Sequence, residues 1–149
     1  MNEQNFSNHA RFVPLFHAFV IPVLVINLGV HIYSLFKYSM NTPYFAFVGI
    51  FSVVLAVALL VLAFLARIFA LGVQDRVIRL EERLRCERLL PDDLKPRIGE
   101  FTIDQLVSLR FASDAELSAL ARTVLDGKVN SRKAIKKMVQ NWRADYQRV

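Results

Sequence analysis

Residues 43–66, PYFAFVGIFSVVLAVALLVLAFLA, decide the fold because they run for 24 positions without a charged side chain. The hydrocarbon core of a bilayer, about 30 Å thick, is crossed by roughly 20 apolar helical residues. This segment is therefore long enough to span a membrane with some tilt. No proline or Gly-Pro pair separates it from the polar sequence that follows. We predict a transmembrane helix at residues 43–69 that continues directly into water.

A second apolar stretch precedes it, at residues 12–36, and is interrupted by few polar side chains. Pro14 suits a first helical turn, whereas Pro22 is expected to kink the helix because it removes a backbone donor. The loop at residues 37–42 is short, so the two helices must be antiparallel neighbours. We predict an all-α fold built on a two-helix transmembrane hairpin. Small residues offer places for close helix approach, namely Gly29, Gly49, Ser52, Ala56 and Ala63.

The charge distribution predicts the orientation of this hairpin. Of the 19 Lys and Arg residues, 17 lie from Arg67 onward, against 12 of the 13 acidic residues. Basic residues beside a span are retained in the cytoplasm, and Arg67, Arg76 and Arg79 follow the second span closely. We expect the N-terminal tail at residues 1–11 and the C-terminus to be cytoplasmic.

Beyond the second span, residues 70–90 carry a heptad pattern. Val73, Val77, Leu80 and Leu84 are spaced by four, three and four residues, which is typical of the a and d positions of a coiled coil. Pairs of opposite charge, Asp75 with Arg79 and Glu81 with Arg85, are expected on the outer faces. An apolar seam in water must be covered, so we predict a homo-oligomer or a subunit of a larger membrane complex.

Residues 91–149 are predicted to form a small helical module. Two prolines and a glycine mark residues 91–99 as a linker, and capping boxes are expected at Thr102 with Gln105 and at Ser113 with Glu116. The helix after Ser113 is expected to end at Gly127. A last helix is predicted after Ser131, with Trp142 in the module core. Its apolar face is composed of Ile135, Met138, Val139, Trp142 and Tyr146.

Three segments resemble an uncharacterised bacterial family of small two-span membrane proteins, a domain of unknown function. They are QNFSNHARFVPLFH at residues 4–17, LRFASD at 109–114 and WRADYQRV at 142–149. The resemblance covers the whole chain and implies a small bacterial membrane protein. It implies no enzymatic activity and transfers no catalytic residue.

Three polar residues, His17, Asn27 and His31, lie in the first span, where such groups normally face protein. On an ideal helix the two histidines lie about 40° apart around the axis and about 21 Å apart along it. Hydrogen bonding to the second span or to a second protomer is the favoured interpretation. The alternative is a small redox carrier in which His17 and His31 of two protomers ligate haem.

Other polar groups suggest weaker sites. In the tail, Asn5, Asn8, His9 and Arg11 are expected to cap the helical module or to bind phosphate, and they offer no metal site. A basic face on the last helix suits anionic lipid rather than nucleic acid and is formed by Arg132, Lys133, Lys136 and Lys137. Cys86 is expected to be a free thiol. We find no catalytic set and expect a non-enzymatic accessory or scaffolding subunit without a cofactor.

Overall fold

A computed structural model describes residues 4–8, 12–38 and 43–145 of the 149. The chain divides into two compact units. We call Phe12–Ala70 the hairpin unit, and we call Met1–Arg11 together with Leu71–Val149 the polar unit. The secondary structure of the described residues is helical, with one isolated β-bridge, so the predicted all-α fold class is confirmed.

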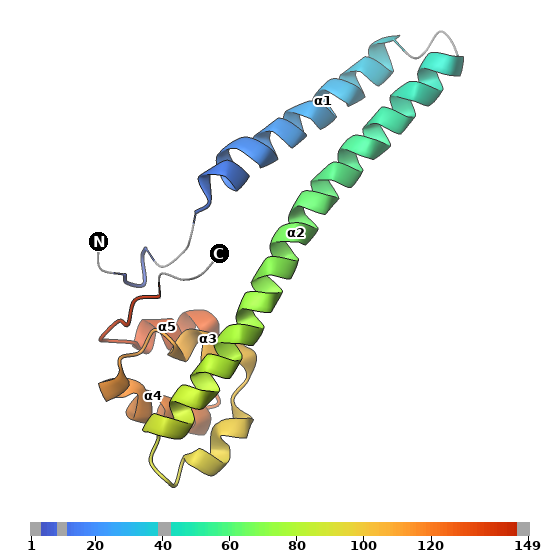
Figure 1. The fold of residues 1–149 in the computed structure, drawn as a ribbon. Coiled ribbons are helices and arrows are strands. Elements are labelled where there is room, and N and C mark those ends of the chain that lie inside the picture. Colours follow the sequence, from blue (N-terminus) through green and yellow to red (C-terminus); the bar gives the residue numbers. More distant parts are fainter. Residues whose placement is uncertain (1–3, 9–11, 39–42, 146–149) are drawn as a thin grey trace. The chain divides into compact units, whose positions relative to one another are not determined.

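The hairpin unit contains η1 (Leu15–Val20), α1 (Ile21–Tyr38) and the first part of α2 (Pro43–Leu89). Leu15–Tyr38 and Pro43–Leu89 are both long and apolar enough to cross a membrane. The α2 helix is uninterrupted (Figure 1), and its range includes Gly72 and the first residues of the polar unit. Its 47 residues correspond to a length of about 70 Å at 1.5 Å per residue.

The first apolar segment begins with a π-helix rather than a kinked α-helix. In η1 the backbone N–H of Ile21 donates to the carbonyl of Phe16, five residues earlier. Pro22 follows directly and has no N–H to donate. The wide turn therefore lies beside the position where the sequence predicts a kink, and it changes the angular register between His17 and the rest of the helix.

Small residues contribute unequally to the inner face of the hairpin. Ala56 is buried, with 2% of its surface exposed, and Ser52 and Ala63 are half-buried. The Ser52 hydroxyl donates to the carbonyl of Val48 at 2.8 Å, so its hydrogen-bond partner lies within the same helix. Gly29 is exposed, and a Cβ atom added there would meet nothing within 4 Å. Gly29 is therefore not a point of close helix approach, contrary to the prediction.

The polar unit packs four short helical elements around the end of α2: η3 (Lys95–Glu100), α3 (Ile103–Leu109), α4 (Asp114–Asp126) and α5 (Arg132–Met138). In Figure 1 they gather beside the last turns of α2. Cys86 and Leu90 of α2 join their hydrophobic core, and α3 packs against both α4 and α5. The module expected at residues 91–149 and the helix extension expected at residues 70–90 thus share one core.

The segment predicted as a linker, residues 91–99, is part of this core. Leu94 is 1% exposed and Ile98 is 7% exposed. Pro91 does end the long helix, and its carbonyl accepts hydrogen bonds from the N–H groups of Leu94 and Lys95. The prolines therefore turn the chain tightly, and the next apolar residues return to α2.

Local helix signals in this unit were informative. The capping box of Thr102 and Gln105 is formed, with N–H to oxygen distances of 2.8 and 3.2 Å. Glu116 accepts the backbone N–H of Ser113 at 3.2 Å, as the second box requires. The α4 helix ends at Asp126, with Gly127 as its C-cap. A Cβ atom at Gly127 would lie 2.8 Å from the Thr123 carbonyl oxygen, so the chain needs glycine there.

The last predicted helix is shorter than expected. It ends at Met138, Val139 is extended, and Trp142 pairs with Ala112 in an antiparallel bridge. Two backbone N–H groups that would continue the helix, those of Gln140 and Asn141, donate instead to Glu116. Trp142 still packs against the core, with its ring 4.9 Å from that of Phe111, although not as a helical residue. Tyr146 lies outside the described residues.

Cys86 is expected to resist alkylation in the folded protein. Its side chain is fully buried, and burial raises the pKa of the thiol from 9.0 to about 11. Only roughly one thousandth of the thiol is then ionised at pH 8, and the thiolate is the reactive form. Because the unfolded thiol ionises first, the free energy of unfolding should fall as the pH rises from about 9 towards 11. Iodoacetamide labelling at pH 8 with and without denaturant, followed by mass spectrometry, tests the protection of the thiol. Equal labelling rates in the two conditions would contradict it.

Candidate functional site

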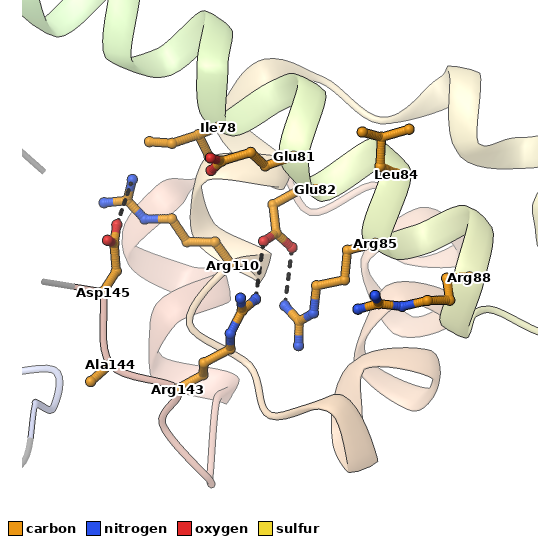
Figure 2. Close-up of a pocket in the computed structure, with 10 residues that line it drawn as sticks. All are labelled: Ile78, Glu81, Glu82, Leu84, Arg85, Arg88, Arg110, Arg143, Ala144 and Asp145. Carbon is orange, nitrogen blue, oxygen red and sulfur yellow. Dashed lines mark hydrogen bonds and ion pairs between the residues drawn. The ribbon is translucent and has the colours of Figure 1, made fainter. Parts of the chain in front are cut away.

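A cavity of about 690 Å³ lies in the polar unit between the end of α2 and the extended segment that follows α5 (Figure 2). Four arginines line it, together with three acidic residues, so the lining carries a formal charge of +1. The α2 helix contributes six residues to the lining, whereas Arg110 comes from the end of α3. The lining consists of Ile78, Glu81, Glu82, Leu84, Arg85, Arg88, Arg110, Arg143, Ala144 and Asp145.

The cavity is built where two separated sequence segments meet, LRFASD at residues 109–114 and WRAD at residues 142–145. The backbone N–H of Arg143 donates to the carbonyl of Phe111 at 2.7 Å. The N–H of Ser113 donates to the carbonyl of Asn141 at 3.0 Å. Two of the segments that carry the family resemblance thus form one short antiparallel pairing, and each contributes an arginine to the cavity.

Arg85 is the centre of the polar network. The residue is 5% exposed, and its side chain donates to Glu82 at 3.0 Å, to Asp114 at 2.6 and 2.9 Å, and to the carbonyl of Ala112 at 2.7 Å. A buried guanidinium requires such partners, because an unpaired buried charge costs several kcal/mol. Arg85 therefore ties α2 to the start of α4 and to the paired segment.

Glu82 faces two arginines from within the protein. It is 4% exposed, and its second carboxylate oxygen lies 3.4 Å from the Nη1 atom of Arg143. Burial raises the pKa of Glu82, while the charges of Arg85 and Arg143 oppose that shift. The two arginines thus stabilise the charged form of Glu82. The ion pair between Glu82 and Arg143 holds the extended C-terminal segment against α2.

The remaining arginine–acid pair connects the cavity to the N-terminal tail. Arg110 is 8% exposed, forms an ion pair with Asp145 at 3.3 Å, and lies over the ring of Phe111 at 4.6 Å. The backbone N–H of Asp145 donates to the side-chain oxygen of Gln4 at 2.8 Å. Part of the third segment of the family resemblance, at residues 4–8, therefore lies beside the other two.

In the tail itself, Asn5 and Asn8 form a local turn. The Asn5 side-chain oxygen accepts from Ser7 and Asn8, and the Asn8 side chain accepts from the Asn5 N–H at 2.6 Å. These contacts are internal to the tail, so capping of the helical module and phosphate binding by these residues stay predictions. The other two candidates of the tail motif, His9 and Arg11, lie outside the described residues.

The heptad residues of α2 lie on the side of the helix away from the core. The exposed fractions are 62% for Val73, 49% for Val77, 61% for Leu80 and 58% for Leu84. The core covers the opposite face through Ile78, Glu82 and Cys86. We call the four exposed residues the apolar seam. The polar unit's own helices therefore do not bury it.

The predicted charge pairs beside the seam are replaced by longer-range contacts. Arg85 binds Glu82 and Asp114 rather than Glu81. Asp75 forms an ion pair with Arg132 of α5 at 2.9 Å. Residues that sequence spacing assigns to surface pairs on one helix thus connect α2 to the rest of the polar unit.

The proposed lipid-binding face on α5 is partly engaged inside the protein. Arg132 binds Asp75 and also Asp104, at 2.9 and 2.6 Å. The ammonium group of Lys136 lies 5.2 Å from the ring centre of Phe111, and that of Lys137 lies 5.8 Å from that of Phe6. Lys133 is exposed. The four residues therefore do not form a uniform solvated face, and anionic lipid binding there stays a prediction.

The polar residues of the first span make local contacts. The Asn27 amide nitrogen lies 3.4 Å from the Nε2 atom of His31, and both residues are half-buried. His17 is exposed, and its Nδ1 atom lies 2.9 Å from the carbonyl oxygen of Val13. These contacts lie within the first helix, so the expected hydrogen bonding to the second span or to a second protomer stays a prediction. Haem ligation by His17 and His31 stays a prediction that a visible absorption spectrum of the purified protein tests.

Sequence reasoning missed the arginine network. Spacing pairs Arg85 with Glu81 on the surface of one helix, and Arg110 and Arg143 enter the sequence analysis only within segments that resemble a family. The available signal was that both segments combine an arginine with an aspartate, in LRFASD and WRAD. Among the described residues, no group of three or more His, Cys, Asp or Glu side chains is arranged to hold a metal ion.

Fold and site together define an all-α protein that combines two helices able to cross a membrane with a helical unit organised around buried arginines. The chain belongs to the family of unknown function DUF6526, whose model matches residues 1–149. The resemblance to an uncharacterised family is thereby confirmed. No curated protein and no solved structure matches the chain.

Proposed function

We propose that this protein is a non-enzymatic membrane scaffold that self-associates through the apolar seam of α2. The observation that supports this most directly is the exposure of Val73, Val77, Leu80 and Leu84 on a helix whose other face is packed. Apolar side chains in a continuous row on a helix in water are unfavourable unless they are covered. The described residues of the polar unit leave these four side chains exposed, and we infer that another chain covers them.

A second copy of the same chain is the occupant that the pattern favours. With Val77 at an a position and Leu80 at the following d position, these two residues match the preference of two-stranded parallel coiled coils, while the same register places Val73 at d and Leu84 at a. Arg76 then falls at a g position and Glu81 at the e position of the next heptad, and both are exposed. In a parallel pair, g and e residues of the two helices meet. Each Arg76 would thus face the Glu81 of its partner, once on each side of the twofold axis.

The apolar helices of the hairpin unit support a membrane location. Their large side chains are exposed rather than packed in a core, with values of 56% for Phe45, 70% for Phe47 and 61% for Phe51. In a bilayer these side chains would contact lipid, and the helical backbone would satisfy its own hydrogen bonds. Copies inserted in one membrane share one orientation, so their α2 helices are parallel, as the pairing of Arg76 with Glu81 requires.

For the orientation we retain the cytoplasmic placement of both termini in the bacterial inner membrane. Arg67, Arg76 and Arg79 follow the second span, and the outer loop contains only Lys37. Basic residues close to a span favour the cytoplasmic side. The contact between Gln4 and Asp145 agrees with both ends lying on the same side of the membrane.

Disulfide crosslinking in membranes tests the proposed pairing. We expect Leu80→Cys to form a covalent dimer on mild oxidation, because d positions of a parallel pair lie next to their own equivalents. The matched control is Arg79→Cys, one residue away and outside the seam, which should remain monomeric. The native Cys86 is buried, so it should contribute no crosslink. Equal crosslinking of the two variants, or none in either, would contradict self-association through the seam.

A further inference from the structure

The four arginines of the cavity differ in how far their donors are already used. Arg85 is satisfied by Glu82, Asp114 and the carbonyl of Ala112. Arg143 is different, because its side chain is 53% exposed and its guanidinium makes one side-chain contact at 3.4 Å, to Glu82. Arg88 is exposed and forms no ion pair within 4 Å to any carboxylate of the described chain. The cavity thus contains two guanidinium groups with donors to spare.

Two of the three acidic residues of the cavity already form ion pairs with its arginines. Glu82 is held between Arg85 and Arg143, and Asp145 is paired with Arg110. Glu81 is the remaining carboxylate, and Figure 2 places it beside Ile78, at the opposite end of the cavity from Arg88. The end of the cavity lined by Arg85, Arg88 and Arg143 therefore has three guanidinium groups against the two carboxylates of Glu82 and Asp114, a formal excess of one positive charge.

We propose that this end of the cavity binds a phosphate group, carried by a small organic phosphate or by a lipid headgroup, with Arg88 and Arg143 as its ligands. A guanidinium presents its N–H groups as a planar fork that matches two phosphate oxygens. Two such forks, from α2 and from the extended segment, supply donors from two directions. Figure 2 shows the Arg88 side chain extending towards Arg85, whose guanidinium lies between those of Arg88 and Arg143.

The size of the cavity suits a ligand larger than a bare ion. Its volume of about 690 Å³ lies within the roughly 300–1,000 Å³ range of small-molecule sites. Apolar walls are provided by Ile78, Leu84 and Ala144. These walls would contact the organic part of the ligand, while the phosphate neutralises the arginines. The proposed phosphate ligands Arg88 and Arg143 come from one chain and are not seam residues, although Leu84 belongs both to the apolar seam and to the cavity wall.

Binding of sn-glycerol 3-phosphate to the full chain in a nonionic detergent, measured by isothermal titration calorimetry, tests the proposal. We expect saturable binding that Arg88→Gln weakens by about tenfold or more, since hydrogen bonds between charged partners are the strong ones. Arg88→Lys should recover only part of the affinity, because it keeps the charge but loses the fork. The matched control is Arg79→Gln, on the same helix but outside the cavity, which should leave the affinity unchanged.

A second arm separates the two sources of phosphate. The thermal unfolding temperature of the polar unit is compared in nanodiscs of phosphatidylcholine with and without phosphatidic acid, for wild type, Arg88→Gln and Arg143→Gln. A response to glycerol 3-phosphate alone supports a soluble ligand, and an Arg88-dependent response to phosphatidic acid supports a lipid. The proposal is overturned if neither ligand has an effect, or if Arg79→Gln reduces the response as much as Arg88→Gln does.

Discussion

Arg85→Ala is expected to destabilise the polar unit by about 3–5 kcal/mol, the range found when one partner of a buried ion pair is removed. The substitution leaves the carboxylate of Glu82 buried with only the 3.4 Å contact to Arg143. It also removes the donor that satisfies the carbonyl of Ala112 at 2.7 Å. A small domain has about 5–15 kcal/mol of stability in total, so much of it would be lost. Urea unfolding of the full chain in detergent, followed by Trp142 fluorescence, measures the change.

A second substitution distinguishes the buried charge from lost packing. Glu82→Gln, introduced into the Arg85→Ala variant, removes the carboxylate that has lost its main partner, and it should recover part of the stability. Arg79→Ala is the control on the same helix and should change the free energy of unfolding by less than about 0.5 kcal/mol. If Arg85→Ala costs no more than this control, the network does not hold the polar unit together.

The sequence was most informative where structure depends on neighbouring residues. The unbroken helix Pro43–Leu89 follows from a long run without proline. The starts of α3 and α4 follow from capping boxes in which the partners are three residues apart. These signals are local, because a helix and its caps are set by residues within one or two turns.

The end of α5 shows why local signals fail elsewhere. Helical spacing of apolar residues predicts that the helix continues through Trp142, and the isolated segment has no residue that would stop it. Glu116, more than twenty residues earlier, accepts the N–H groups of Gln140 and Asn141, and Phe111 accepts that of Arg143. Tertiary hydrogen bonds thus replace the helical ones. No sequence pattern within residues 131–146 predicts these tertiary bonds.

The candidate site could not be predicted for the same reason. Arg85 and Asp114 are 29 residues apart, and Glu82 and Arg143 are 61 residues apart. From spacing alone, Arg85 has a nearer partner in Glu81, four residues away, which is the usual interpretation of a charged helix. Only the pairing of residues 111–113 with 141–143 brings the distant partners to α2. By contrast, the apolar seam depends on spacing within one helix, and its residues were named correctly as an exposed row.

Leu80→Asp is expected to convert the dimer into a monomer in mild detergent. A twofold pairing buries two copies of Leu80, and each buried leucine contributes about 1.5–3 kcal/mol. Loss of both corresponds to an increase of at least about a hundredfold in the dimer dissociation constant, before the cost of placing two carboxylates against each other is added. Because Leu80 is 61% exposed within its own chain, the polar unit should keep its fold.

For the Leu80→Asp variant, both the mass of the complex and the folded state of the polar unit must be measured. Light scattering coupled to size exclusion gives the protein mass after the detergent contribution is subtracted, and Trp142 fluorescence reports whether the polar unit is intact. Arg79→Asp serves as the matched control, because it introduces the same side chain one position away and should remain dimeric. A Leu80→Asp protein that is folded and still dimeric would show that association occurs elsewhere, for example between the hairpin helices. A folded monomer, with Arg79→Asp dimeric, would assign the interface to the seam, because only the face of α2 differs between the two variants.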